Sequence, residues 1–373
     1  MIDKPFDALT YADIEALVAA GRGEERRLEF KRQLVAGSDG DKKEYLADLS
    51  SLANAQGGDL IFGVEEANGV ASSVPGIMLD DADKEILRLE QLALAGLQPR
   101  ISGLRSRFLP STPDSKTGVL VQRVPASLNA PHRVVFQNWG KFFARHSRGK
   151  SEMDVLELRE AFTASEGALP RLRGLHMRLS DLTHVPQRPG AQLVMTLAPL
   201  ALARRQEMLE LLSYQDAATP PLEGSLDSAQ TLEGFLCWTK TGDGQAFDQV
   251  LTHRAGYVEG LSSQAPPNTQ STEIMVSEIA KFLRIVTQDA VRKLNAKGLS
   301  GPWALMASLI GVNGVQLYTG GRSRPTRPSN RYQFDFREVI FDDFEPSVLI
   351  PLMRQVWWAF GRERPADQDI NSG

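Results

Sequence analysis

The segment Gly23-Glu24-Glu25-Arg26-Arg27-Leu28-Glu29-Phe30-Lys31-Arg32 decides the fold of the first part of this chain. In its second half, Leu28-Glu29-Phe30-Lys31 alternates apolar and charged residues, which is the two-residue period of a β-strand. We expect Leu28 and Phe30 to face a core, and Glu29 and Lys31 to share the opposite, exposed face. That face has two interpretations. It is either a solvated ion pair, which stabilises little, or a carboxylate and an ammonium that hold a divalent metal next to a phosphate.

Two later parts of the sequence belong with this strand. Residues Lys42–Ala53 have the apolar spacing of an amphipathic helix, which ends at Ser51-Leu52-Ala53-Asn54-Ala55-Gln56-Gly57-Gly58. A buried strand follows and ends in two acids, Asp59-Leu60-Ile61-Phe62-Gly63-Val64-Glu65-Glu66. A third part comprises Val124-Pro125-Ala126-Ser127, Ala130-Pro131-His132 and Phe142-Phe143-Ala144-Arg145-His146.

These segments, in this order and at this spacing, resemble the AlbA-type domain of the Schlafen superfamily over about residues 8–165. The resemblance implies an α+β domain with a mixed sheet that processes nucleic acid. In ribonuclease members of the superfamily the acids of this motif form a metal site, and the matching positions here are Glu24, Glu29 and Glu66. The third position is usually Asp in those members, so Glu66 is a departure. Many bacterial relatives are described only as DNA-binding proteins.

The three acids suit Mg²⁺ or Mn²⁺, which prefer oxygen ligands. Glu24 and Glu29 are five residues apart, so within one strand they would point to opposite faces. They converge only if Glu24 lies in the turn before the strand, which Gly21 and Gly23 permit. Glu66 reaches Glu29 only if the two strands are neighbours. This set is therefore a prediction about tertiary structure.

A basic cluster follows the aromatic residues Trp139, Phe142 and Phe143. Cations beside exposed aromatic rings suit phosphate contact and base stacking, whereas the alternative is a solvated hairpin with one of the rings in the core. The residues expected to contact nucleic acid are Lys31, Arg32, Arg145, His146, Arg148 and Lys150.

Composition limits the classes of function. The net charge is −4, and residues 1–165 hold 21 Lys and Arg against 24 Asp and Glu, a net charge of −3. Any nucleic-acid contact must therefore come from a local cluster. The single cysteine, Cys237, excludes an intrachain disulfide and a cysteine-rich zinc site. We expect no membrane span and no signal peptide, and hence a cytoplasmic protein.

The 373 residues are long enough for two domains. We expect a nucleic-acid-processing domain at 1–168, a second α+β domain at 185–362 for substrate selection, sensing or dimerisation, and a disordered tail at 363–373. In the first domain we further expect these elements: helix Tyr11–Ala20 with a capping box of Thr10 and Asp13, helix Asp80–Leu94, strands Ile101–Leu109 and Gly118–Val124, a hairpin of Val134–Gln137 with Lys141–Ala144, and a helix capped by Ser151 and Asp154.

In the second domain the expected strands are Ala191–Leu200, Leu232–Thr239, Ala246–Glu259 with a break near Gly256, and material within Trp303–Tyr318. The expected helices are Glu273–Asn295 and Pro346–Phe360. A basic loop, Gly320–Pro328, contains Arg322, Arg324 and Arg327.

The favoured function is a divalent-metal-dependent endoribonuclease that acts on structured RNA such as tRNA, in stress or anti-phage defence. Glu24, Glu29 and Glu66 would hold Mg²⁺ or Mn²⁺, and Lys31 would neutralise charge on the phosphate. The alternative is a non-catalytic DNA- or RNA-binding regulator with the same domain, and a third hypothesis is a structural partner in a toxin or defence system. RNA is favoured over DNA as the partner, and a homodimer is compatible with the sequence.

Overall fold

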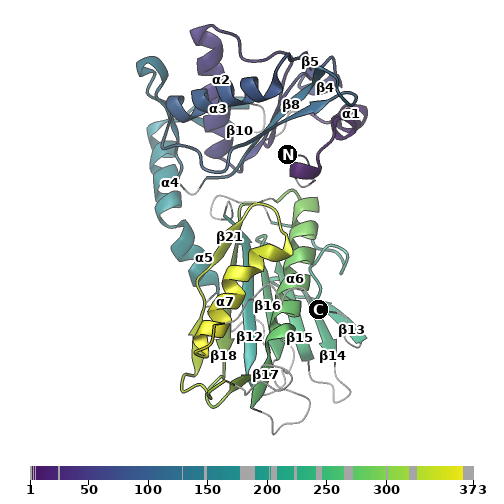
Figure 1. Cartoon of the computed structure of the whole chain (residues 1–373), viewed down its shortest axis with the longest axis vertical. Helices are drawn as coiled ribbons and strands as arrows, with labels where there is room; N and C mark the ends of the chain where they lie inside the picture. The colour runs from purple at the N-terminus through teal and green to yellow at the C-terminus, as the bar shows by residue number, and fades with distance from the viewer. Residues whose placement is uncertain are drawn as a thin grey trace. The chain divides into compact units, whose positions relative to one another are not determined.

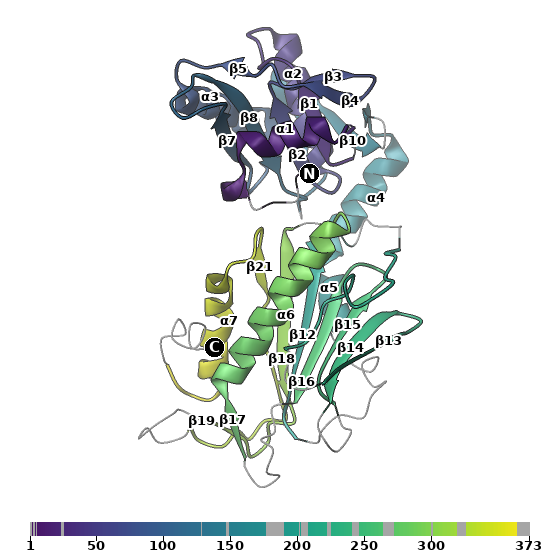
Figure 2. The ribbon, with the colours of Figure 1, turned by 90° about the vertical axis from the view of Figure 1, so that its right-hand side faces the viewer.

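The computed structural model divides the chain into two compact units, Met1–Ala168 and Leu169–Gly373 (Figures 1 and 2). Each unit combines helices with sheets, so the predicted α+β class is confirmed. Among the described residues, none of the helices has both the length and the apolarity that a membrane span requires. The structure describes the chain except for residues 1, 3, 5, 24–25, 128, 147–148, 177–189, 201, 203–207, 222–224, 241–245, 264–271, 300, 319–325 and 364–373.

The first unit is built on a mixed five-stranded sheet with the order β1-β2-β8-β5, in which β7 also pairs with β8. Strands β1 and β2 are neighbours and pair in parallel, whereas the other pairs are antiparallel. The strands are β1 (Leu28–Lys31), β2 (Gly58–Phe62), β5 (Ile77–Met78), β7 (Arg105–Pro110) and β8 (Thr117–Val124). A separate hairpin joins β3 (Glu65–Ala67) to β4 (Val70–Ser73).

Both faces of this sheet are covered by helices. Leu28, Phe30 and Ile61 pack with Ile14 of the first helix, whereas Leu60 and Phe62 pack in a second cluster with the next two helices. This division follows from the alternation of side chains along each strand. The helices are η1 (Phe6–Ala8), α1 (Tyr11–Ala19), α2 (Asp39–Ala53), α3 (Ala82–Gly96) and α4 (Val155–Glu166).

A second sheet of this unit has the order β11-β10-β9-β6 and contains the predicted hairpin. Lys141 pairs with Val134, and the connection between them includes a short 3-10 turn. The elements are β6 (Leu97–Gln98), β9 (Arg133–Val134), η2 (Phe136–Asn138), β10 (Lys141–His146) and β11 (Gly149–Glu152).

The two predicted capping boxes have different outcomes. The box of Thr10 and Asp13 is present at α1. The box predicted for Ser151 and Asp154 is wrong, because Ser151 pairs with Ala144 in β11 and its backbone is extended. Helix α4 is instead capped by Asp154, which forms the box with Glu157.

Asn54, just after α2, ties the helix to the second sheet. Its side-chain oxygen accepts a hydrogen bond from the backbone N–H of His132 at 2.6 Å. Its amide nitrogen donates to the backbone carbonyls of His132 at 3.2 Å and Phe143 at 3.0 Å. Because buried polar groups need partners, this single side chain fixes where β9 and β10 lie against α2.

The glycine pair that follows allows close backbone approach. Gly57 has φ +70°, and a Cβ there would lie 2.6 Å from the backbone nitrogen of Ala126 and from the carbonyl oxygen of Val124. A Cβ on Gly58 would lie 2.6 Å from the carbonyl oxygen of Arg27. The residues from Asn54 to Gly58, which carry much of the family resemblance, are therefore a structural frame around β1 and β2.

The second unit has an eight-stranded sheet of order β13-β14-β15-β16-β12-β18-β20, with β21 also paired to β18. Its connected strand pairs are antiparallel. The strands are β12 (Gln192–Pro199), β13 (Ser225–Gln230), β14 (Gly234–Lys240), β15 (Ala246–His253), β16 (Val258–Ser263), β18 (Trp303–Ile310), β20 (Gln333–Asp335) and β21 (Val339–Phe341).

Two helices, α6 (Val276–Ala296) and α7 (Ile350–Ala359), cover one face of this sheet and form its main core (Figures 1 and 2). The predicted helix start at Glu273 is wrong, because Glu273–Met275 is the strand β17 and pairs in parallel with β19 (Gln316–Tyr318). The predicted closing helix is divided into η5 (Pro346–Leu349) and α7. Residues 364–373 of the expected tail, and Arg322 and Arg324 of the expected basic loop, lie outside the described residues.

Helix α5 (Ala168–His176), which we did not predict, ends in a buried histidine. The Nδ1 atom of His176 lies 2.9 Å from the hydroxyl of Thr196, and Nε2 lies 2.8 Å from the hydroxyl of Ser308. The Ser308 hydroxyl donates in turn to Asp335 at 2.7 Å. Burial lowers the pKa of His176 to about 4, an effect that Asp335 opposes only in part.

We predict that replacing Asn54 with Leu destabilises the first unit by about 2–4 kcal/mol, because the backbone N–H of His132 and the carbonyl of Phe143 lose the side chain that hydrogen-bonds them. Urea unfolding, followed by circular dichroism, measures the change. The control is Asn129→Ala, at an exposed position, which we expect to stay within about 0.5 kcal/mol of the parent. Equal effects of the two substitutions would contradict the role given to Asn54.

We also predict an acid-sensitive second unit. The folded pKa of His176 lies below its unfolded value, so the unfolded chain binds more protons as pH falls from about 6.5 to about 4, and stability is lost over that range. The loss attributable to His176 is on the order of 3 kcal/mol. Urea unfolding followed by tryptophan fluorescence should show a shallower pH dependence in His176→Gln than in the parent. Identical slopes in the parent and His176→Gln would refute this assignment.

Candidate nucleic-acid interface

The charged residues of β1 lie on the same face as α2. In the parallel register Glu29 is opposite Leu60 and Lys31 is opposite Phe62, and both of these apolar residues pack with α2. Leu28 and Phe30 face the other core, so the predicted alternation is confirmed. The expectation that Glu29 is exposed is wrong, because its carboxylate is buried and lies between Lys31 of the same strand and Arg145 of β10.

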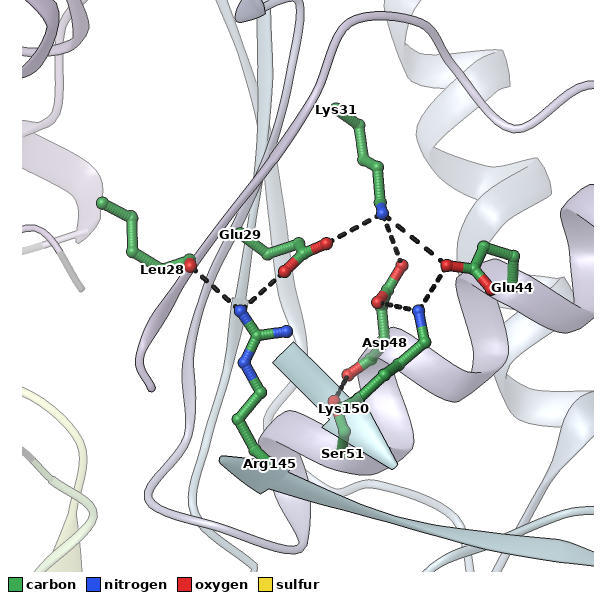
Figure 3. Close-up of polar contacts among 8 residues, drawn as sticks. All are labelled: Leu28, Glu29, Lys31, Glu44, Asp48, Ser51, Arg145 and Lys150. Atoms are coloured by element: carbon green, nitrogen blue, oxygen red, sulfur yellow. Dashed lines mark hydrogen bonds and ion pairs between the residues drawn. The ribbon is translucent and has the colours of Figure 1, made fainter. Parts of the chain in front are cut away.

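The two oxygens of the Glu29 carboxylate have different cationic partners. Oε1 lies 2.8 Å from Nζ of Lys31, and Oε2 lies 2.6 Å from the guanidinium of Arg145. Arg145 also donates to the backbone carbonyl of Leu28 at 3.1 Å. Figure 3 shows these contacts around the edge of β1. Arg145 was expected on an exposed hairpin, but its side chain is 1% exposed, so it positions Glu29.

Two acids of α2 extend this network to Lys150 of β11. Nζ of Lys150 lies 2.5 Å from Oδ1 of Asp48 and 2.5 Å from Oε1 of Glu44. Nζ of Lys31 lies 3.3 Å from Asp48 and 3.9 Å from Glu44. In Figure 3 both ammonium groups point toward the same two carboxylates. We call Glu29, Lys31, Glu44, Asp48, Arg145 and Lys150 the charge cluster.

Exposure increases steadily across the charge cluster. The side chains of Asp48 and Glu29 are 1% and 8% exposed, Lys150 and Lys31 are 16% and 30% exposed, and Glu44 is 57% exposed. The buried acids therefore hold the two lysines from inside, and Glu44 contacts them at the rim, where solvent also reaches.

The pKa shifts follow from this arrangement. Burial alone would raise the pKa of Glu29, but Arg145 and Lys31 outweigh it and hold that pKa below its usual value. Burial raises the pKa of Asp48, and Lys150 opposes that change only in part. The pKa of Lys31 is raised because Asp48 and Glu29 outweigh its desolvation. Lys31 is thus a firmly charged cation beside an ionised Glu29.

Sequence reasoning missed Asp48 and Glu44. They are four residues apart on α2, so their side chains lie on one face of the helix. Asp48 is also four residues before Leu52, so its carboxylate lies within an otherwise apolar stripe. An acid in the buried stripe of an amphipathic helix is the signal that could have identified Asp48, since a buried carboxylate requires a partner.

Two of the other predicted nucleic-acid residues, Arg32 and His146, contact residues outside the charge cluster. Arg32 pairs with Glu65 at 3.0 Å and is largely exposed. The exposed His146 lies 2.8 Å from the hydroxyl of Ser151 and 3.8 Å from Glu157. Arg148 lies outside the described residues.

The predicted metal ligands are distributed as follows. Glu29 is in the charge cluster, Glu66 is exposed in the β3–β4 hairpin opposite Ala71, and Glu24 is outside the described residues. Within the described part of the chain, no three residues among His, Cys, Asp and Glu are grouped so that they could hold a metal ion. Both oxygens of Glu29 are also occupied by cations. The set Glu24, Glu29 and Glu66 with Mg²⁺ or Mn²⁺ therefore stays a prediction.

A second feature of this unit is an aromatic residue that lies beside two lysines, one from α2 and one from β10. Nζ of Lys43 and Nζ of Lys141 each lie 5.7 Å from the ring centroid of Trp139. The ring of Trp139 packs at 5.3 Å on Phe143, which anchors it in the domain. Trp139 directly follows Gln137 and Asn138, two residues in the left-handed conformation (φ 47° and 58°).

Comparison with known proteins bears on the first unit. Residues 24–154 match the family model Schlafen, AlbA_2. No curated protein matches the chain.

Two solved structures are similar to part of the chain. The DIP2311 protein from Corynebacterium diphtheriae is 16% identical, with a TM-score of 0.28, over 42% of this chain and 28% of that protein. The N-terminal domain of a RecG-related protein from Nitrosomonas europaea is 21% identical, with a TM-score of 0.29, over 39% of this chain and 93% of that domain. On the family match, residues 24–154 are a domain of the Schlafen AlbA_2 family.

Proposed function

We propose that the first unit binds nucleic acid, with RNA as the favoured partner, through phosphate contacts at Lys31 and Lys150. The Schlafen AlbA_2 match supports nucleic-acid binding in general. The observation that carries the proposal is that two partly exposed ammonium groups converge on one point of the surface, held there by the buried carboxylates of Glu29 and Asp48.

A phosphate reaches this point by exchange with Glu44. The carboxylate of Glu44 is the outermost group of the charge cluster and bonds Lys150 from the solvent side. Exposed ion pairs of this kind contribute about 0–1 kcal/mol, so their replacement by a phosphate costs little. The phosphate oxygens then receive charge-assisted hydrogen bonds from both lysines, while Glu29 and Asp48 keep the lysines in place.

This mechanism agrees with the acidic composition of the chain. A net charge of −4 gives no general attraction for a polyanion, so binding depends on a few preorganised cations. With two phosphate contacts the salt dependence is shallow, because each contact on a single strand contributes a slope of about −0.7 in log K against log salt.

Trp139 supports the choice of unpaired nucleotides. The half-buried ring of Trp139, beside two lysines, offers part of its surface for base stacking in the same unit as the phosphate contacts, and stacking contributes about 1–3 kcal/mol per base. Bases are accessible for stacking in loops and single strands, which is how most RNA-binding modules select RNA. Loops of structured RNA such as tRNA meet this description.

A second candidate is the divalent-metal-dependent endoribonuclease. The observation in its favour is the ionised Glu29, which is fixed at 2.8 Å from the charged Lys31. Mg²⁺ or Mn²⁺, if held by Glu24, Glu29 and Glu66, would act as a Lewis acid toward a phosphate. The described acids do not by themselves form a ligand set, so we derive no step from that ion.

We predict opposite effects of two substitutions on RNA affinity. Lys150→Gln should raise the Kd for a fluorescent single-stranded RNA about tenfold, because a phosphate contact is lost, and should reduce the magnitude of the salt slope by about 0.7. Glu44→Gln should lower the Kd about two- to fivefold, because the competing carboxylate loses its charge. Fluorescence anisotropy over a salt series measures both effects.

The matched controls are Lys116→Gln and Glu15→Gln. Lys116 is exposed and pairs with Asp80 next to β5, at the sheet edge opposite β1, and Glu15 is exposed on α1. Neither control should change the Kd by more than about 1.5-fold. Weaker binding by Glu44→Gln would contradict the exchange of Glu44 for phosphate.

For the second candidate we predict that the protein cleaves total tRNA with Mn²⁺ and not with EDTA, and that Glu29→Gln abolishes cleavage whereas Glu15→Gln does not. Glu29 is buried between cations, so its variant should also melt at a lower temperature. Cleavage is therefore measured by gel at a temperature where both variants are folded. Three results would eliminate this candidate: cleavage in the presence of EDTA, cleavage by folded Glu29→Gln at the rate of the parent, or absence of cleavage by the parent.

A further inference from the structure

The second unit contains a groove of about 900 Å³ beside helix α7. It is lined on one side by residues between Arg327 and Phe336, which include β20. On the other side it is lined by residues between Gln355 and Arg362, at the C-terminal end of α7. This volume lies within the range of about 300–1,000 Å³ that ligand sites occupy. We call it the α7 groove.

Aromatic side chains form the floor and one wall of the α7 groove. Trp358 is 56% exposed, although its neighbour Trp357 is buried in the core. Phe334 and Phe360 also line the groove, and their ring centroids lie 5.3 Å apart at an angle of 56°. The packed pair makes a firm base, so the exposed ring of Trp358 is held at the edge of a preformed surface.

The charged groups that line the α7 groove are mainly cationic. Arg327, Arg331 and Arg362 all line it, against one acid, Asp335. Asp335 accepts hydrogen bonds from Ser308 at 2.7 Å and from Gln333 at 2.6 Å, which commit one of its oxygens to the sheet. The guanidinium of Arg331 lies 5.8 Å from the ring centroid of Phe334. The described residues that line the groove therefore carry a formal charge of +2, beside the exposed indole of Trp358.

This combination of groups selects one ligand chemistry. Guanidinium groups bind phosphate with paired hydrogen bonds, and an exposed indole stacks on a planar ring. An apolar protein segment would use the aromatic rings but would offer no negative charge to a lining that contains more arginines than acids. A simple anion would use the arginines but would leave Trp358 without a partner.

We propose that the α7 groove binds an unpaired nucleotide, with the base stacked on Trp358 and the phosphate at Arg331 and its neighbouring arginines. The source is either a free mononucleotide or a nucleotide within a single strand, since both present the same base and phosphate. This site is separate from the charge cluster and does not depend on the function proposed for it. If the source is a strand, the chain has two contacts for one RNA, and the second contact forms at the higher effective concentration that tethering provides.

The test uses the intact chain in two experiments. In the first, a 5-iodouridine-labelled hexanucleotide is photo-crosslinked to the protein, and the crosslinked residues are mapped by mass spectrometry. In the second, the binding of uridine monophosphate is measured by calorimetric titration. We expect crosslinks at Trp358 or Phe334 in the parent. Trp358→Leu and Arg331→Gln should each remove these crosslinks and weaken binding at this site about fivefold or more, which corresponds to about 1 kcal/mol of stacking or phosphate contact. Crosslinks to the first unit should persist in both variants.

Two substitutions of similar residues serve as controls. Tyr332→Leu removes an aromatic ring that is 67% exposed outside the groove, and Arg354→Gln removes an exposed arginine on α7 that does not line the groove. Both should retain the groove crosslinks. Saturable mononucleotide binding that is lost in Trp358→Leu would support a free nucleotide, and hexanucleotide binding alone would support a strand.

Three results would overturn the proposal. The first is crosslinking confined to the first unit in the parent. The second is unchanged affinity and crosslinking in both folded groove variants. The third is a change of oligomeric state by light scattering in Trp358→Leu with no change in nucleotide binding, which would make the groove a protein contact. Because the charge cluster is intact in every variant, failure here leaves the function proposed for the first unit unaffected.

Discussion

The carboxylate of Glu29 is the contact on which the arrangement of the first unit depends. It joins β1, at the edge of one sheet, to Arg145 of the other sheet, and it sets the position of Lys31 on its own strand. Removal of one partner from a buried ion pair costs about 3–5 kcal/mol, because the remaining charge is left without compensation. The same contact that joins the two sheets therefore also orients the cation that we propose for phosphate binding.

The charge cluster and the α7 groove each place cationic side chains together on a chain whose net charge is negative, but they do so in different ways. The chain is acidic overall, so neither unit attracts a polyanion through its total charge. In the first unit, buried acids orient lysines, and the exposed Glu44 contacts them where we propose that a phosphate binds. In the second, arginines surround an exposed indole. Local geometry, more than net charge, determines where a phosphate would bind in both units.

Much of the local structure could be predicted from periodicity and end signals. The alternation of Leu28 to Lys31 predicted β1, and the apolar spacing from Tyr45 to Leu52 predicted most of α2. Prediction failed where a short segment that resembles a helix start or cap pairs with another strand. Glu273–Met275 reads as the start of a helix but pairs with β19, and Ser151 reads as a cap but pairs with Ala144. Such pairings leave almost no mark on the local sequence.

The sequence by itself determined which side chains of β1 are apolar and which are charged, and it determined the family of the domain through its ordered motifs. Only the tertiary structure decided that the charged face is covered. Strand alternation divides residues between two faces but does not say what packs on each face. Helix α2 brings Glu44 and Asp48 there, and β10 and β11 bring Arg145 and Lys150. Those residues are between 13 and 121 positions away from Lys31 or Glu29 along the chain, so their convergence depends on packing, which no local pattern encodes.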